Sequence, residues 1–477
     1  MYALLILTPF LGSFILNLPF RKVNKRLSFG VCAALFLLQM AVILIPDFGL
    51  NKINPAALAN IFNFDLGVDA LSKVMLFCIG LVALVTLCTN SLFLKDSDDK
   101  FNFINVLLIA VSGMNGIVLA KDIFSLYVFL EITAVASFIL IAFNREELGL
   151  EGAFKYILLS SIATVLMIAG IALFFLVSGS THFAAIHSAL LAQDKSLLIN
   201  LAIALFVSAL FIKGGLMPFH GWLPDAYSSA PAASSVFLAG IVTKAAGVYV
   251  LIRILVSIAG FSLTLKSVLL FVGAFSAIIG AIAALTQTDF KRMLSYSSIS
   301  QIGYIILGVG TGTVLGLAGA ALHIFNHAVF KSLLFMNSAA VEKALGTRDI
   351  SKMGGLGSQM PVTGLTSVLG SLSCAGIPPL AGFWSKLIII IALWSAGFKT
   401  YAVIAILGSV LTLAYFLSLQ RSVFFGKLNA EFKNIKEAGF SLLFPMILLG
   451  VITLGVGIFL PLVLDKFILS FNAVLGG

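Results

Sequence analysis

Long apolar segments follow one another along almost the whole chain, without strict alternation of apolar and polar residues. Their length of about 18–25 residues is that of a membrane-spanning helix, whereas barrel strands are about ten residues long and alternate. Backbone groups in lipid must be satisfied within the segment, so the pattern predicts an all-α integral membrane protein. About fourteen spans are expected, near residues 2–20, 28–46, 70–94, 103–120, 122–143, 152–178, 197–219, 228–258, 263–286, 292–311, 312–341, 361–396, 400–425 and 438–468; the longest loop is 47–69.

The composition agrees with a lipid environment. Hydrophobic residues make up 60% of the chain and charged residues 10%, whereas a soluble domain carries roughly 25% charged residues. The four cysteines form no CxxC pair and lie in apolar segments (Cys32, Cys78, Cys88 and Cys374). They are expected to be small buried hydrophobes, not ligands of zinc or an iron–sulfur cluster. We therefore expect no cofactor and no metal on this chain; in a redox complex, the redox centres would lie on other subunits.

Lysine and arginine are divided unevenly between the two sets of loops. Because cytoplasmic loops are enriched in positive charge, the bias predicts an inner (plasma) membrane protein with both termini outside. The net charge of +10 then reflects orientation in the membrane and does not indicate nucleic-acid binding. Sixteen basic residues follow odd-numbered spans (Arg21, Lys22, Lys25, Arg26, Lys95, Lys100, Arg145, Lys291, Arg292, Lys343, Arg348, Lys352, Arg421, Lys427, Lys433 and Lys436), against seven on the other side (Lys52, Lys121, Lys195, Arg253, Lys266, Lys399 and Lys466).

Two predicted spans contain helix-breaking residues. The seventh continues Lys-Gly-Gly-Leu-Met-Pro from Lys213, and the twelfth contains Gly-Ile-Pro-Pro from Gly376. Proline removes a backbone donor and glycine tolerates the bend, and such a break at membrane depth must pack against protein or line a wet cavity. Broken helices five spans apart predict two inverted five-helix repeats with ion sites at the breaks.

The predicted organisation has four parts. Residues 1–100 hold helices 1–3, 101–260 the first repeat (helices 4–8), 261–427 the second repeat (helices 9–13), and 428–477 helix 14.

Titratable side chains within the spans are the candidate functional residues. Glu131 is the one carboxylate at mid-span, where it needs a positive partner or must stay protonated. It is interpreted as functional, with a structural counter-ion that locks two helices as the alternative. Four lysines also fall within spans (Lys213, Lys244, Lys331 and Lys386). A buried lysine can release its proton, which an arginine cannot do, so this choice of residue favours proton handling.

The eleventh span carries His323, His327 and Lys331 at intervals of four residues. This spacing puts all three side chains on one stripe of a helix, which suits a proton relay through waters. A zinc site of the HEXXH type would need a glutamate where the chain has Ile324. Haem ligation is the other alternative, with His220 as the remaining span-associated histidine.

Five motifs resemble those of the proton-conducting antiporter-like subunits. They are KGGLMPFHGWLPD from Lys213, LAGIVTK from Leu238, TDFKRMLSYSSISQIGY from Thr288, HAVFKSLLF from His327 and GIPPLAGFWSK from Gly376. The family includes membrane-arm subunits of respiratory complex I, energy-converting hydrogenases and formate hydrogenlyases, and subunits of multisubunit Na+/H+ antiporters. The resemblance covers roughly residues 65–430 and implies fourteen helices, inverted repeats and a polar axis in the membrane plane.

The resemblance also implies roles for the candidate residues. Glu131 matches the glutamate of the fifth helix, Lys213 the lysine of the seventh and Lys244 the bridging lysine of the eighth. His323, His327 and Lys331 match the relay of the eleventh helix, and Lys386 the terminal lysine of the twelfth, where one complex I branch has glutamate. Gln301 stands where some members have histidine. The chain ends soon after span 14, so it resembles the shorter subunits, which lack a lateral helix.

Two functions are expected from this resemblance. In the first, the chain is a proton-translocating subunit of a redox-driven complex, assembled with related antiporter-like membrane subunits. The sequence around Lys386 and the sequence from His327 to Lys331 are similar to those of hydrogenase-type members. In the second, it is a subunit of a secondary Na+/H+ antiporter. A purely structural subunit fits poorly with so many titratable groups. Protons are expected to pass from Lys213 and Lys244 towards Lys386, with the Glu131–Lys213 pair as a switch.

Overall fold

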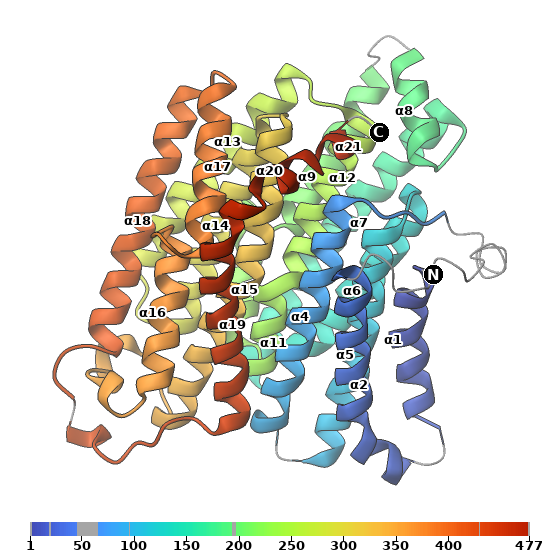
Figure 1. Ribbon diagram of the computed structural model, residues 1–477. Helices are drawn as coiled ribbons and strands as arrows, with labels where there is room; N and C mark the ends of the chain where they lie inside the picture. Colours follow the sequence, from blue (N-terminus) through green and yellow to red (C-terminus); the bar gives the residue numbers. More distant parts are fainter. Residues whose placement is uncertain are drawn as a thin grey trace.

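The computed structural model describes residues 2–18, 21–44, 65–94, 96–192, 197–428 and 430–475. Most of the predicted loop 47–69, with Lys52, lies outside the described residues, as do Lys95 and Lys195. The described chain folds into a bundle of long helices (Figure 1). Its only β-pairing is three isolated bridges, which join Leu66 to Ala120, Asp122 to His182 and Asp289 to Asp349.

The helices follow one another as the apolar pattern predicts. The first part contains α1 (Ala3–Leu16), α2 (Arg21–Leu44), α4 (Ala70–Phe93), α5 (Ser97–Leu119), α6 (Ile123–Ile141), α7 (Glu147–Ser178), α8 (Phe183–Ala192), α9 (Leu197–Lys213) and α10 (Trp222–Ser229). One long span then alternates α- and π-helical turns: α11 (Ala232–Phe237), η2 (Leu238–Val242), η3 (Lys244–Tyr249), α12 (Val250–Ile254) and η4 (Leu255–Ala259). The remainder contains α13 (Leu263–Leu285), α14 (Phe290–Gly310), α15 (Val314–Leu345), η5 (Ile350–Lys352), η6 (Leu356–Ser358), α16 (Pro361–Ala375), α17 (Ala381–Ser395), α18 (Lys399–Val423), η7 (Ala430–Phe432), α19 (Phe440–Phe459), η8 (Leu460–Leu462), α20 (Leu464–Leu469) and α21 (Asn472–Leu475).

All fourteen predicted spans correspond to helices. Ten helices of the described chain are long and apolar enough to cross a membrane. The other predicted spans are α1 and α9, which are shorter, α14, which is rich in polar residues, and the interrupted pair α16–α17. The prediction of an all-α membrane protein with about fourteen spans is therefore confirmed. The short helix α8 was not predicted.

Aspartates mark the start of several spans. The carboxylates of Asp69, Asp122 and Asp289 each accept a hydrogen bond from the backbone N–H three residues later, at 2.7–2.8 Å. This N-cap satisfies one of the free amides at the start of a helix. Acidic residues therefore collect at the ends of the spans.

The two ends of the helix bundle are named as follows. The end where α5, α7 and α14 begin is called the basic end, because most basic loops lie there. The other end of the bundle is called the opposite end.

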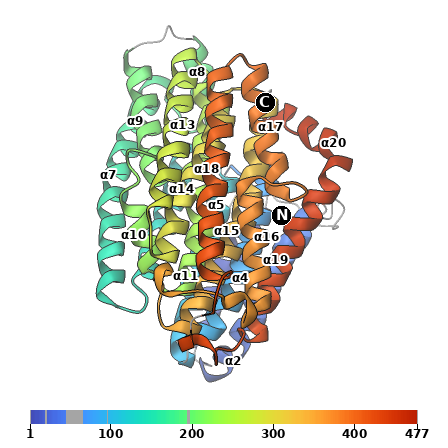
Figure 2. The ribbon, with the colours of Figure 1, turned by 90° about the vertical axis from the view of Figure 1, so that its left-hand side faces the viewer.

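Helix α15 lies at the centre of the bundle. It is 32 residues long and packs against α4, α11, α14, α16, α17 and α19. Helix α18 lies at the left-hand edge of the bundle in Figure 1 and α7 at the left-hand edge in Figure 2. Both present apolar side chains outward, such as Leu176 and Val410. The most polar segments are thus shielded from lipid by apolar ones.

The two broken spans run in opposite directions. The chain leaves α9 after Lys213 and resumes helix at Trp222 on the way to the basic end, whereas it leaves α16 after Ala375 on the way from that end. Gly215 and Gly376 have φ of 64° and 87°, a left-handed conformation that favours glycine. This geometry confirms the two discontinuous helices of an inverted repeat. The predicted residue boundaries of the four parts stay predictions.

Neighbouring side chains bind the backbone groups that the breaks leave free. The indole Nε1 of Trp222 donates to the carbonyl of Ile212 at 3.0 Å. In the second break, the backbone N–H of Gly382 donates to Ser373 Oγ at 3.2 Å. These hydrogen bonds satisfy one backbone group at each break, whereas Pro218, Phe219, Pro378 and Pro379 are exposed on this chain.

Candidate functional site

Glu131 and Lys213 form an ion pair beside the first break. Lys213 is the last residue of α9, and its Nζ lies 3.2 Å from Glu131 Oε1 on α6. The lysine is 3% exposed, whereas the Glu131 side chain is 32% exposed and lies at the surface of the helix bundle. Helix α7 supplies two hydroxyls: Thr164 donates to Glu131 at 2.7 Å, and Lys213 donates to Ser160 at 3.3 Å.

Lys244 lies at the junction of two π-helical segments and is fully buried. Its Nζ donates to the carbonyl of Ala239 and, at 3.2 Å, to Thr243 Oγ1. The Thr243 hydroxyl lies 2.9 Å from the hydroxyl of Tyr227 on α10. π-Turns are rare and occur often at functional sites. Here they let the amine reach back along its own helix towards the basic end.

His323, His327 and Lys331 share one face of α15, as their spacing predicts, and all three are fully buried. The Lys331 amine donates to Ser297 Oγ at 2.6 Å and to the carbonyl of Leu294 at 3.1 Å, both on α14. Neither ring nitrogen of His327 has a hydrogen-bond partner among the described residues. In the described chain, no three His, Cys, Asp or Glu side chains gather as metal ligands do.

Lys386 lies on α17, directly after the second break. Its Nζ lies 4.3 Å from the centre of the Tyr304 ring and 3.5 Å from the carbonyl of Ala375, the last residue of α16. The preceding residue, Ser385, lies 2.9 Å from His323 Nδ1. The serine hydroxyl therefore joins the helix of the terminal lysine to the histidine stripe.

Five of the seven predicted residues form one row, which we call the basic row: Lys244, His327, Lys331, His323 and Lys386. Electrostatic interactions link His327 to Lys244, Lys331 and His323, and link His323 to Lys386. Lys331 also interacts with Lys244 and Lys386. The row crosses from the first repeat to the second.

The Glu131–Lys213 pair lies next to the helix that carries Lys244. A Cβ at Gly247, three residues after Lys244, would lie 2.4 Å from the Cα of Gly214 in the first break. The short distance between these two backbone segments places the first break next to the helix that carries Lys244, the first member of the basic row.

Several polar partners of the site were missed from the sequence. They are Ser160, Thr164, Tyr227, Thr243, Ser297, Tyr304 and Ser385. Serine and threonine have no fixed spacing to the groups they contact, and several contacts join helices far apart in sequence. The one signal was the dense Ser-Tyr-Ser-Ser-Ile-Ser-Gln run of α14, which is too polar for a helix facing lipid. Gln301 from this run donates to Thr412 at 3.3 Å.

Comparisons with known proteins agree with this geometry. A family profile described as NADH:quinone oxidoreductase/Mrp antiporter, TM, matches residues 120–412. The chain is 31% identical over 462 residues to a Na(+)/H(+) antiporter subunit of Alkalihalophilus pseudofirmus, and the match covers 95% of this chain and 92% of that protein. It is 33% identical over 383 residues to an NADH-quinone oxidoreductase subunit of Desulforudis audaxviator, covering 79% and 75%.

The fold is also that of a known complex subunit. A chain in the Mrp complex from Dietzia sp. DQ12-45-1b matches with a TM-score of 0.88 and 24% identity, over 99% of this chain and 97% of that one. The family profile spans more than half of the present chain, and its range contains all seven predicted site residues. The chain therefore belongs to the NADH:quinone oxidoreductase/Mrp antiporter family of membrane proteins.

Proposed function

We propose that the chain conducts protons as an antiporter-like membrane subunit of a multisubunit, redox-driven ion pump. The basic row carries this proposal. Its five side chains are 0–3% exposed, and buried groups of like charge cannot all be protonated together in a medium of low dielectric constant. A proton on one member therefore weakens proton binding by the next, which is the property that stepwise transfer needs.

The proposed route begins at Lys213 and Lys244 and ends at Lys386, where the second break meets α17. The Glu131–Lys213 pair acts as the switch. With the pair closed, the carboxylate stabilises the protonated amine; with the pair open, the proton moves on to the basic row. The pair lies at the edge of the chain, where a neighbouring subunit could open it.

The partners are other membrane subunits of the complex, including related antiporter-like subunits. Relatives are named as subunits of an NADH-quinone oxidoreductase and of a Na(+)/H(+) antiporter. The chain itself holds no redox centre in this proposal. A second function, as a subunit of a secondary Na+/H+ antiporter, is favoured by the match to the Alkalihalophilus antiporter protein over 95% of the chain.

The proposed location is the cell inner (plasma) membrane, with the basic end in the cytoplasm and both termini outside. The excess of lysine and arginine in the loops at this end supports the orientation. The basic row then conducts between the cytoplasm and the outside.

The test uses the native assembly in sealed vesicles, with proton movement followed by a pH-sensitive dye. Either an electron donor and acceptor or a Na+ gradient drives transport. Lys386→Met is expected to abolish proton movement, whereas Lys399→Met, an exposed lysine at the start of α18, leaves it unchanged. A response to electron flow alone supports the redox pump, and a response to Na+ alone supports the antiporter. Normal transport by Lys386→Met in an intact assembly would contradict both.

A further inference from the structure

Helices α15 and α17 approach each other closely beside His323. A Cβ at Gly319, one helical turn before His323, would lie 2.9 Å from a methyl carbon of Ile388 on α17. This close approach brings the imidazole next to the hydroxyl of Ser385, with 2.9 Å between Nδ1 and Oγ. Both His323 and Ser385 are 0% exposed, so water at the protein surface does not compete for this contact.

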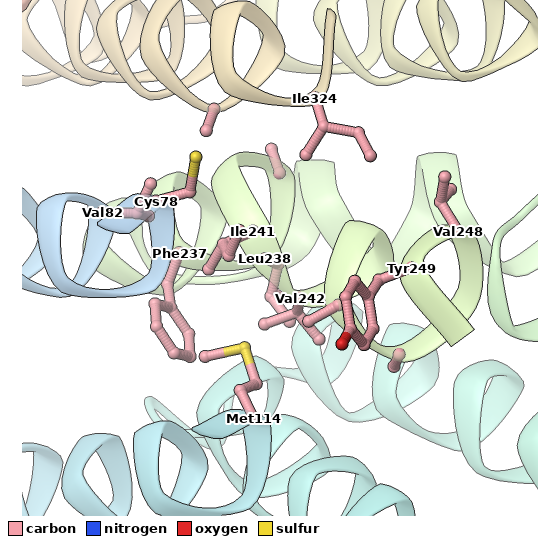
Figure 3. Packing of buried hydrophobic residues seen from close by; sticks show 14 of the residues in the cluster. Cys78, Val82, Met114, Phe237, Leu238, Ile241, Val242, Val248, Tyr249 and Ile324 are labelled. Atoms are coloured by element: carbon pink, nitrogen blue, oxygen red, sulfur yellow. The ribbon is translucent and has the colours of Figure 1, made fainter. Parts of the chain in front are cut away.

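Asn326 reaches the same hydroxyl from α15. Figure 3 shows Ile324 directed from α15 towards η2 of the long span. Because an α-helix turns by about 100° per residue, Asn326 lies roughly opposite Ile324 and faces α17. Its Nδ2 donates to the carbonyl of Ala381 at 2.8 Å and to Ser385 Oγ at 2.9 Å. The imidazole and the amide therefore contact one hydroxyl from one face of α15.

Both hydrogens of the Asn326 amide are used in these contacts. A backbone carbonyl only accepts hydrogen bonds, so the amide atom next to the carbonyl of Ala381 must be the nitrogen. The amide oxygen, Oδ1, has no hydrogen-bond partner among the described residues. Asn326 is therefore a donor to Ser385, and it occupies one of the two lone pairs of the serine oxygen.

The hydroxyl of Ser385 has two further neighbours. It donates to the carbonyl of Gly382 at 3.1 Å, and it lies beside Nδ1 of His323. A hydroxyl has one proton and two lone pairs. The Gly382 carbonyl takes the proton and the amide of Asn326 takes one lone pair, so the remaining lone pair can only accept. In this arrangement, Nδ1 of the neutral His323 ring carries the hydrogen.

The opposite arrangement has one hydrogen bond fewer. There the hydroxyl donates to His323 Nδ1, the ring hydrogen is on Nε2, and the carbonyl of Gly382 loses its bond to Ser385. The hydrogen on Nε2 is then buried without an acceptor, since Nε2 has no partner in the part of the chain that the structure describes. One hydrogen bond of ordinary strength corresponds to roughly a two- to tenfold ratio. The contacts therefore favour the Nδ1–H tautomer, whereas free histidine favours the Nε2–H tautomer.

We propose that Ser385 and Asn326 are positioning residues that hold the hydrogen of neutral His323 on Nδ1 and leave Nε2 as the atom that takes up and releases the proton. Uptake from a neighbouring member of the basic row forms the Nε2–H bond, and release breaks the same bond. Nδ1–H donates to the serine oxygen in both the neutral and the charged ring, so the hydroxyl keeps its orientation through the transfer. The inference rests on the proposed proton conduction for its purpose, but the tautomer is measured without transport.

Solid-state NMR of the native assembly with isotope-labelled histidine tests the tautomer. The signals of His323 are identified as those that His323→Gln removes. The chemical shifts of the ring atoms distinguish the two neutral tautomers, and the spectra are taken at alkaline pH, at which imidazole is neutral. Nδ1–H is expected to exceed Nε2–H at least about twofold. A majority of Nε2–H in the wild type would overturn the inference.

Variants test the two positioning residues. Ser385→Ala removes the acceptor of Nδ1–H, so Nε2–H should become the majority form. Asn326→Leu frees the hydroxyl to turn towards Nδ1 and should lower the ratio at least about twofold. Ser300→Ala is the matched control, because Ser300 is also 0% exposed and its hydroxyl donates to the carbonyl of Ala277 at 2.8 Å; it should keep the wild-type ratio. An unchanged ratio in Ser385→Ala would overturn the inference, and an unchanged ratio in Asn326→Leu would overturn the role of the amide.

Transport by the same variants separates this inference from the proposed function. Asn326→Leu should slow proton movement at least about twofold, in step with the change of tautomer, whereas Ser300→Ala should transport at the normal rate. A wild-type ring with Nδ1–H, together with normal proton movement by His323→Gln, would contradict the proposed conduction. A ring with Nε2–H would overturn the present inference at any rate of transport.

Discussion

Replacing Glu131 with glutamine removes the carboxylate next to Lys213 while keeping the size of the side chain. The two charged atoms are 3.2 Å apart. At that distance Coulomb attraction is about 5 kcal/mol at an effective dielectric constant of 20 and about 1.3 kcal/mol in bulk water. Because the Glu131 side chain is 32% exposed, the true value lies between these limits. Even the lower limit corresponds to about a tenfold loss of stabilisation of protonated Lys213.

The expected result is an initial rate of proton movement at least about tenfold below that of the wild type. Without the Glu131 carboxylate, the Lys213 amine no longer retains its proton. Thr164→Val removes only the hydrogen bond of 2.7 Å that the hydroxyl donates to the Glu131 carboxylate, and it keeps the carboxylate itself. A hydrogen bond to a charged group contributes about 1.5 kcal/mol at the lower end of its range, which suits a side chain that is 32% exposed, so this variant should lose about tenfold. The assay is dye-detected proton movement in sealed vesicles, normalised to the amount of assembled complex.

Glu151→Gln is the matched control on α7. Its carboxylate pairs with Lys155 at 2.6 Å, but the Glu151 side chain is 54% exposed, and exposed pairs contribute little. The expected order of rates is wild type and Glu151→Gln first, then Thr164→Val, then Glu131→Gln. Wild-type transport by Glu131→Gln in a fully assembled complex would refute the switch.

Three further outcomes are expected. Ser385→Ala removes the hydroxyl 2.9 Å from His323 Nδ1 and, at about 1 kcal/mol for a hydrogen bond, should slow proton movement severalfold without loss of assembly. Asp69→Asn removes the negative charge and one of the two oxygens that accept hydrogen bonds of 2.5 and 3.0 Å from Arg253 and should lower stability by about 3–5 kcal/mol in detergent unfolding. Burial raises the pKa of Asp69, but the Arg253 guanidinium outweighs burial and holds that pKa well below its usual value. The wild-type stabilisation is therefore present above about pH 4 and lost as the pH falls further. Gly247→Ala puts a Cβ 2.4 Å from the backbone of the first break and should remove the subunit from the purified complex.

The sequence was sufficient to predict the features that depend on the local pattern of apolar and polar residues. Bilayer thickness sets the length of a span, so the apolar runs predicted the helices. The glycine and proline that follow Lys213 and the pair Pro378–Pro379 predicted the breaks, because these residues cannot continue a helix. Intervals of four residues predicted that His323 and Lys331 share a face.

Contacts between distant helices could not be predicted in this way. The hydroxyls of Ser160 and Thr164 reach the Glu131–Lys213 pair from α7, and no local pattern encodes which helix lies beside which. The π-turns at Lys244 depend on packing across the bundle and have no signature in the sequence. Periodicity describes one helix at a time, whereas the site is assembled from at least six.

Helix α14 has a consequence for how the protein is made. It is 21 residues long, and all of its residues except Arg292 and Tyr296 are buried, yet it is not among the helices apolar enough to cross a membrane. Polar residues at the centre of a segment disfavour its release from the translocon into lipid. Because α14 packs closely against α13 and α15, it has to be inserted together with them. Substitutions that loosen this trio would therefore reduce the yield of inserted protein during biosynthesis, before any step of transport is reached.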